Sequence, residues 1–122
     1  MLRILLADDH EFIRKSLRQI LMEEFPSVLI GEAGDTKTLI EMVLSEPWDL
    51  VISDISMPGG GGLEALHYIQ LRLPALPILI LSIYPVEQFA PRVVLAGASG
   101  YLNKDAPPEQ LLQTVKEILA RR

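Results

Sequence analysis

Five short apolar runs alternate with stretches of helical spacing, and this alternation constrains the fold more than any other feature of the sequence. The runs are residues 4–7, 28–33, 50–53, 78–81 and 100–102. Strands that alternate with helices predict βαβ units and a parallel sheet. Because the runs are apolar on both faces, helices should cover both sides of that sheet. We therefore predict an α/β protein with a doubly wound, five-stranded parallel sheet, a flavodoxin-like (βα)5 domain in three layers.

Four of the intervening stretches carry apolar residues three or four positions apart, as one buried face of a helix requires. These residues are Ile13, Leu17, Ile20 and Leu21; Leu39, Ile40, Val43 and Leu44; Leu63, Leu66, Ile69 and Leu73; and Leu111, Leu112, Val115, Ile118 and Leu119. Asp35 is placed to cap the second helix, and Pro107 and Pro108 suit the first turn of the last.

The stretch before the fifth run contains a conflict. Pro85 could open a helix, but Pro91 would then fall in its interior, where it removes a hydrogen bond and clashes with the preceding turn. We therefore predict that the regular helix starts only near Ala90, after an irregular approach from Ile83.

Length and composition exclude several classes of protein. A chain of 122 residues corresponds to one domain, residues 1–122, and 49% hydrophobic residues suffice for a core. The net charge of −5 opposes autonomous binding to DNA or RNA. The absence of cysteine excludes disulfides and thiol chemistry. No apolar run could span a membrane and no signal peptide is evident, so we expect a cytoplasmic protein.

Polar side chains follow four of the predicted strands at their carboxyl ends. Asp8 and Asp9 follow the first strand, Asp54 the third, Ser82 the fourth and Lys104 the fifth. In a doubly wound sheet these ends border one crevice, where ligands bind. Each residue alone has an ordinary structural role open to it, such as a helix cap or a surface lysine. Their joint placement is what predicts a site.

The charges of these residues indicate a chemistry. Carboxylates that share a crevice repel one another unless cations compensate them. Mg²⁺ prefers hard oxygen ligands, so Asp8, Asp9 and Asp54 predict a magnesium site completed by a backbone carbonyl and waters. With Mg²⁺ and Lys104 neutralising charge, Asp54 could attack phosphorus and form an acyl phosphate. Ser82 would hydrogen-bond to a phosphoryl oxygen and would move in doing so.

Three segments hold these residues: Leu5-Leu6-Ala7-Asp8-Asp9-His10, Asp54-Ile55-Ser56-Met57-Pro58-Gly59 and Gly100-Tyr101-Leu102-Asn103-Lys104-Asp105. Together they resemble the receiver domains of bacterial two-component response regulators, and the resemblance covers essentially the whole chain. It implies that a sensor histidine kinase phosphorylates Asp54. It also implies that Asp9, Asp54 and the carbonyl of Ser56 bind Mg²⁺ directly, while Asp8 helps through water.

The resemblance further implies a switch and an output. Ser82 and Tyr101 would couple phosphorylation to a changed surface on the fourth helix, fifth strand and fifth helix, and we expect a homodimer in the phosphorylated state. The motifs are most similar to the subgroup with a C-terminal helix-turn-helix of LuxR type, whose members control transcription. We expect that DNA is contacted only by such a domain, outside these residues. The alternative is a stand-alone receiver that acts through protein–protein interaction.

Other functions of similar folds lack a feature here. A haloacid-dehalogenase-type phosphatase uses a second Asp two residues after its nucleophile; this chain has Ser56 there, which argues against an enzyme and for a phosphoryl group that persists. A flavin carrier needs a phosphate loop after the first strand, and the glycines at 59–62 lack a nucleotide-binding pattern and predict a flexible loop. The complete acid, hydroxyl and lysine set argues against a phosphorylation-independent module. His10 would be an unusual Mg²⁺ ligand, and His67 should face solvent.

Overall fold

The computed structural model confirms the predicted fold class, with five parallel strands in one sheet and five helices among the described residues. The structure describes residues 1–57, 59, 62–83 and 86–121, and only the backbone of residues 86–90. The strands are β1 (Arg3–Ala7), β2 (Leu29–Ala33), β3 (Leu50–Asp54), β4 (Ile78–Ser82) and β5 (Gly100–Asn103). The helices are α1 (Glu11–Glu24), α2 (Thr36–Ser45), α3 (Gly62–Arg72), α4 (Val86–Leu95) and α5 (Pro108–Arg121). Every predicted strand agrees with its observed bounds to within one residue.

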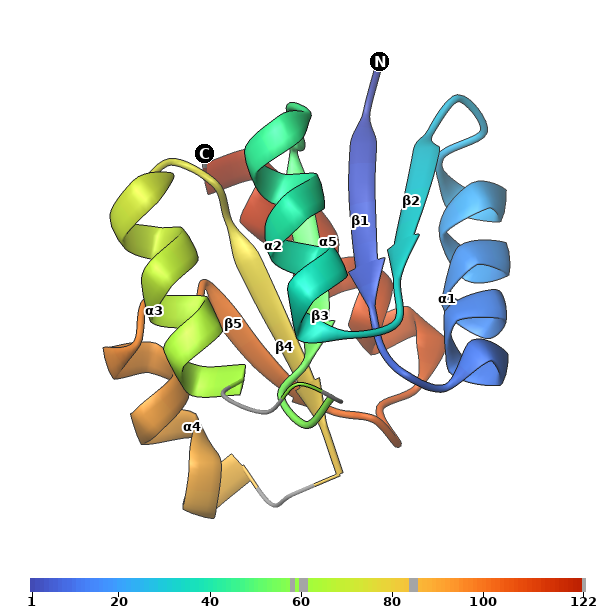
Figure 1. Ribbon diagram of the computed structural model, residues 1–122. Coiled ribbons are helices and arrows are strands. Elements are labelled where there is room, and N and C mark those ends of the chain that lie inside the picture. The colour runs from blue at the N-terminus through green and yellow to red at the C-terminus, as the bar shows by residue number, and fades with distance from the viewer. Residues whose placement is uncertain (58, 60–61, 84–85, 122) are drawn as a thin grey trace.

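The strand order indicates at which edge of the sheet a ligand site is expected. The order is β2-β1-β3-β4-β5, and all four neighbouring pairs are parallel. The chain therefore moves outward from β1 to β2 and then, from β3 onward, in the opposite direction. The carboxyl ends of all strands lie at the same edge of the sheet (Figure 1). In such sheets the ligand site lies outside these ends, where the direction of winding reverses, here between β1 and β3.

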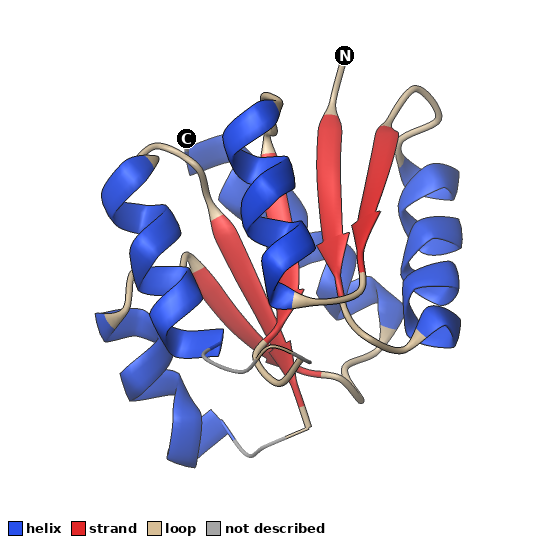
Figure 2. Cartoon of the chain, in the orientation of Figure 1, coloured by secondary structure: helices blue, strands red, loops and turns tan. Residues whose placement is uncertain are grey.

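Helices cover both faces of the sheet, which gives the predicted three layers (Figure 2). Side chains of α2, α3 and α4 pack on one face against Leu5, Val51 and Ile80. Side chains of α1 and α5 pack on the other face, against a set that includes Leu6 and Ile52. Successive residues of one strand thus enter opposite cores, as the two-residue period of a strand requires. Every residue of β3 and β4 is buried, which explains why residues 50–52 and 78–81 are all apolar.

Local signals fix the ends of two helices. The Asp35 carboxylate accepts the Thr38 N–H at 2.7 Å, which confirms Asp35 as the N-cap of α2. After α4, Gly97 has a φ of +109° and its N–H donates to the Val94 carbonyl, while the Ala98 N–H donates to the Val93 carbonyl. This is a Schellman motif, which needs a left-handed residue at the position of Gly97.

The predicted late start of α4 is wrong. The helix begins at Val86 and contains Pro91 in its interior, not only from Ala90 onward. Proline removes one intrahelical hydrogen bond, the one to the carbonyl four residues earlier, while Val93 is fully buried and packs the helix against the sheet. Pro85, which the sequence suggested as the opening residue, lies outside the described residues.

The single tryptophan lies near the opposite, amino-terminal edge of the sheet. Trp48 precedes β3, and its indole N–H donates to the Met42 carbonyl at 3.0 Å. Its ring fills the space beside Gly31, where a Cβ would come within 2.4 Å of it. The Arg3 guanidinium lies 5.0 Å from the centre of the ring.

Among the described residues, no helix has the length and apolar character that crossing a bilayer requires.

Candidate functional site

Two carboxylates leave adjacent strands at the carboxyl edge of the sheet. Asp8 follows β1 directly and Asp54 is the last residue of β3, and these strands are paired so that Ala7 lies opposite Ser53. Both acidic residues are buried, with 3% and 7% of their surfaces exposed. Neighbouring strands in register therefore deliver two buried negative charges to the same place.

Lys104 lies between these carboxylates. Its Nζ atom is 2.8 Å from Asp8 Oδ2 and 3.1 Å from Asp54 Oδ2, and 11% of its side chain is exposed. The lysine comes from the loop after β5, and its backbone N–H donates to the Ser82 carbonyl at 2.9 Å. The main chain at the ends of β4 and β5 thus directs the ammonium toward β1 and β3.

The ammonium changes the protonation equilibria of the pocket. Burial disfavours the charged form of Asp8, but the hydrogen bonds from Lys104 and from the His10 N–H outweigh burial, so the pKa of Asp8 lies below its ordinary value. Burial likewise opposes the charge of Lys104, yet its hydrogen bonds to Asp8 and Asp54 prevail and raise the pKa of Lys104. At neutral pH the pair Asp8 and Lys104 is therefore ionised.

Four residues at this edge have the geometry to hold a cation. One ligand atom each from Asp8, Asp9, His10 and Asp54 can be chosen so that all lie within 4.8 Å of one another. The three carboxylates provide the hard oxygen donors that Mg²⁺ prefers, so the donor set fits this ion. The imidazole is the exception, because nitrogen ligands suit transition metals better.

The other predicted site residues lie in the loop after β3, at the end of β4 and within β5. The Ser56 N–H donates to Asp54 Oδ1 at 3.2 Å, and the Ser56 side chain is exposed. Ser82 ends β4 and is fully buried. Tyr101 lies in β5 opposite Ile80, half-buried, and packs on the sheet face that α2, α3 and α4 cover. Among the described residues, the contacts to the acidic side chains thus include those of Lys104, His10 and the Ser56 N–H.

Three residues near the acids were missed or underrated by the sequence reasoning. His10 Nδ1 lies 2.8 Å from Asp8 Oδ1 and 3.2 Å from Asp9 Oδ1, whereas the sequence suggested only that it would be an unusual Mg²⁺ ligand. Arg14 in α1 donates to the Asp8 carbonyl and, at 2.9 Å, to the Glu32 carboxylate. A signal was present in Glu32, a charged residue inside the apolar run 28–33.

Two lesser predictions also concern this region. His67 is exposed on α3, as expected. The glycine loop falls partly outside the described residues, because Gly60 and Gly61 are not described. Gly62 is described, and a Cβ there would lie 1.8 Å from the Ile55 carbonyl oxygen. The backbone at Gly62 therefore lies so close to the Ile55 carbonyl that only glycine fits without a shift.

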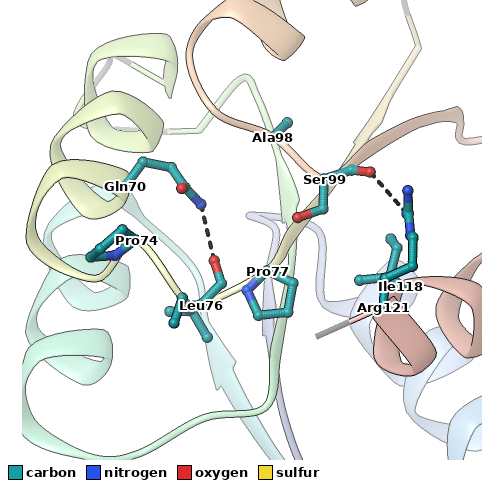
Figure 3. Close-up of a pocket in the computed structure, with 9 residues that line it drawn as sticks. Gln70, Pro74, Leu76, Pro77, Ala98, Ser99, Ile118 and Arg121 are labelled. Atoms are coloured by element: carbon teal, nitrogen blue, oxygen red, sulfur yellow. Dashed lines mark hydrogen bonds between the residues drawn. The ribbon is translucent and has the colours of Figure 1, made fainter.

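A second hollow, of about 370 Å³, lies at the opposite edge of the sheet (Figure 3). Two of its side chains hydrogen-bond to backbone carbonyls: Gln70 donates to the Leu76 carbonyl at 2.9 Å, and Arg121 donates to the Ser99 carbonyl at 3.3 Å. The described residues that line it include no carboxylate. The hollow therefore lacks the cluster of charged groups that places the candidate site at the carboxyl edge.

Comparison with known proteins shows what the chain is similar to. A family model described as the response regulator receiver domain matches residues 4–116. The DNA-binding transcriptional activator DevR/DosR of Mycobacterium tuberculosis is 34% identical over 122 residues, which are 100% of this chain and 56% of that protein. The chain spans about half the length of the curated relatives it matches.

Solved structures of similar chains share the fold. A LuxR-family two-component response regulator from Aurantimonas sp. SI85-9A1 is 36% identical with a TM-score of 0.89, covering 98% of this chain and 86% of that one. The response regulator TrrA from Thermotoga maritima, solved in complex with Mg²⁺ and BeF, is 32% identical with a TM-score of 0.86, covering 97% and 99% of the two chains. The similarity therefore extends over nearly the whole of this chain.

Proposed function

Because this chain belongs to the family of response regulator receiver domains, we propose that Asp54 accepts a phosphoryl group from a sensor histidine kinase and thereby switches the surface of the domain. The observation that carries the proposal is the buried Asp54 carboxylate, 3.1 Å from the Lys104 ammonium and clustered with Asp8 and Asp9. Receiver domains are signalling modules, and we propose this role in place of catalytic turnover.

The transfer is a displacement at phosphorus. A carboxylate oxygen of Asp54 attacks the phosphorus of a phosphohistidine, an O–P bond forms, the P–N bond breaks, and the imidazole nitrogen takes the electron pair. The product is an acyl phosphate. Lys104 pairs with phosphoryl oxygens and holds them close to Asp54, while the Ser82 hydroxyl donates to one of them.

The carboxylates of Asp8, Asp9 and Asp54, with the carbonyl of Ser56, are the residues that would hold Mg²⁺. When bound, Mg²⁺ neutralises charge on the transferring phosphoryl group. The fit of the donor set supports this ion, as does the structure of TrrA with Mg²⁺ and BeF. Lys104 already neutralises part of the charge of Asp8 and Asp54. When Mg²⁺ binds these carboxylates, the Lys104 ammonium would be available to pair with phosphoryl oxygens.

The phosphoryl group should persist rather than turn over. Position 56, two residues after the nucleophile, holds serine instead of the aspartate that a phosphatase would use as its general acid. We propose that Ser82 and Tyr101 then report the acyl phosphate to α4, β5 and α5. Such a switch requires two conformations that differ by a few kcal/mol, one of them favoured by the phosphoryl group.

We propose that residues 1–122 form a single receiver within a longer transcription regulator of LuxR type. The curated relatives are about twice as long as this chain, and one is named as a DNA-binding transcriptional activator. The net charge of −5 is unsuited to DNA contact by this domain itself. In this proposal the phosphorylated receiver forms a homodimer in the cytoplasm and a further domain binds DNA; a stand-alone receiver that acts on a protein partner is the alternative.

A labelling experiment tests the proposal. The chain is incubated with Mg²⁺ and acetyl phosphate, and intact mass and released phosphate are followed over time, with Asp54→Asn as the matched control. We expect about one phosphoryl group per chain, dependent on Mg²⁺ and absent from the variant. Continuous release of phosphate would instead indicate an enzyme, and no labelling at all would indicate a binding module that works without phosphorylation.

A further inference from the structure

Arg14 links the acidic loop to the neighbouring strand. It lies in the first turn of α1, and 18% of its side chain is exposed. One end of its guanidinium donates to the backbone carbonyl of Asp8, and its Nε donates to Glu32 Oε1 at 2.9 Å. A single planar group thus bridges the main chain after β1 and a carboxylate of β2.

The peptide groups of Asp8 are held on both sides. The Asp8 N–H donates to the Ala33 carbonyl at 3.0 Å, which extends the ladder between β1 and β2 by one bond. The Asp8 carbonyl accepts from Arg14, which is itself bonded to Glu32, the residue before Ala33. Both hydrogen-bonded links from the Asp8 backbone therefore end at the last two residues of β2.

The hydrogen bond from Arg14 to the Asp8 carbonyl also restricts Asp9. The carbonyl of Asp8 and the N–H of Asp9 belong to one rigid peptide plane. Fixing the direction of the carbonyl therefore fixes the rotation of the plane from which the Asp9 side chain projects. Without the bond from Arg14, that plane would be freer to rotate about the single bonds on either side of it.

We propose that Arg14 is a positioning residue for the magnesium site, which acts by orienting the peptide between Asp8 and Asp9 so that both carboxylates face Asp54. The inference rests on the proposed function, because it assumes that these carboxylates bind Mg²⁺. Arg14 touches neither the metal nor the phosphoryl group. It acts through the main chain, and Glu32 holds its guanidinium in place.

Electrostatics alone predicts the opposite effect. A cation close to a cation site weakens the binding of Mg²⁺, so removing the charge of Arg14 should tighten binding if charge is all that matters. Removing a positioning contact should weaken it. The sign of the change in Mg²⁺ affinity therefore separates a positioning role from a purely electrostatic one.

Arg18 provides a matched control. It pairs with the other oxygen of the same carboxylate, Glu32 Oε2, at 3.0 Å, and 49% of its side chain is exposed. Substitution of either arginine by glutamine removes one positive charge from the same helix. Within the described residues, only Arg14 of the two donates to the backbone of Asp8.

The experiment titrates Mg²⁺ into the wild-type chain and the variants Arg14→Lys, Arg14→Gln, Arg18→Lys and Arg18→Gln, by calorimetry and by the amide NMR shifts of residues 8–10. We expect both Arg14 variants to bind Mg²⁺ about 10-fold or more weakly, the scale found when residues behind a metal ligand are changed. The Arg18 variants should change affinity by less than about 3-fold, as exposed charges do. Thermal unfolding in Mg²⁺-free buffer identifies variants that are folded.

The outcomes are distinct. Equal affinity of Arg14→Lys and wild type, with tighter binding by Arg14→Gln, would overturn the inference and leave the proposed function intact. A wild-type chain that binds no Mg²⁺ would overturn the proposed metal site, and this inference with it. If Arg14→Gln does not fold, Arg14→Lys decides, since lysine keeps the charge but cannot reproduce the planar, two-pronged donor.

Discussion

At the scale of single residues, Lys104 determines the electrostatic balance of the pocket. Its ammonium contacts two buried carboxylates that come from different strands. Each of these hydrogen bonds joins charged groups, and such bonds are stronger than those between neutral groups. Removing the lysine should therefore leave two negative charges in a partly desolvated space.

Lys104→Met keeps the length of the side chain and removes the ammonium. In Mg²⁺-free buffer at neutral pH we expect the free energy of unfolding to fall by about 2 kcal/mol, because two buried carboxylates lose a charged donor. Mg²⁺ should restore part of this loss, because the ion compensates the same carboxylates. Urea denaturation with and without Mg²⁺ measures both effects.

Lys116→Met is the control for that substitution. Lys116 pairs with Glu24 at 2.7 Å, but 55% of its side chain is exposed. Surface pairs of this kind contribute about 0 to 1 kcal/mol, so this variant should lose little stability. If Lys104→Met is no less stable than Lys116→Met, the carboxylates do not depend on the buried ammonium.

The sequence contains enough information to predict some of these contacts and not others. Asp8, Asp54 and Lys104 stand at strand ends, so a correct fold places them together, and the observed separations of 2.8 and 3.1 Å agree with that reasoning. The bonds of Arg14 depend on how α1 is rotated about its axis and packed beside β2. No local pattern in the sequence specifies that rotation.

At the scale of elements, the cap of α2 makes a prediction about pH. The bond from the Thr38 N–H stabilises the ionised carboxylate and lowers the pKa of Asp35 in the folded chain. A group with a depressed folded pKa contributes stability above its unfolded pKa and loses that contribution as pH falls through the folded value. We expect Asp35→Ala to melt below wild type at pH 7, with a difference that shrinks below about pH 4.

Asp35→Asn separates the cap from the charge. Asparagine keeps an oxygen that can accept the Thr38 N–H but does not titrate. Its melting temperature should follow that of wild type with less dependence on pH in the acidic range. Thermal unfolding of the three proteins between pH 3 and pH 7 tests the assignment, which fails if the alanine variant differs equally from wild type at both ends.

Helix α4 makes a prediction about Pro91. Pro91 is exposed within the helix, so alanine would fit there and would restore the missing backbone donor. We expect Pro91→Ala to raise the free energy of unfolding by about 1 to 3 kcal/mol. Amide exchange across residues 86–95 should slow in the variant. Unchanged stability and exchange would mean that the helix is not continuous through residue 91 in solution.

The elements also show where sequence reasoning succeeded and failed. The strands were predicted to within one residue because β1, β3 and β4 are apolar on both faces, a pattern that few structures besides a central parallel strand produce. The start of α4 was predicted wrongly because the rule that proline disfavours a helix interior was applied without knowledge of how this helix packs. Burial of Val93 is a tertiary contact, and the sequence around Pro91 does not reveal its strength.

At the scale of the whole molecule, binding at the carboxyl edge should stabilise the fold. A ligand that binds only the folded state adds free energy according to its concentration, about 2.7 kcal/mol at 100 times its dissociation constant. We expect Mg²⁺ at that excess to raise the melting temperature of wild type, and to do so much less for Asp54→Asn, which lacks one carboxylate of the cluster. Buffers of matched ionic strength, with K⁺ in place of Mg²⁺, provide the reference; equal stabilisation of both proteins would place the ion elsewhere.

The position of Trp48 determines what tryptophan fluorescence can report about this protein. The indole ring reaches Gly31, which is in register with Val51 through Leu5, and the three residues from Val51 to Asp54 span about 10 Å. An ion at the pocket cannot touch the fluorophore, so direct contact quenching is excluded as a source of signal. Any change in Trp48 fluorescence on ion binding would therefore require a conformational change transmitted through the sheet. The single tryptophan is thus a probe of that conformational change and not of contact with the ion.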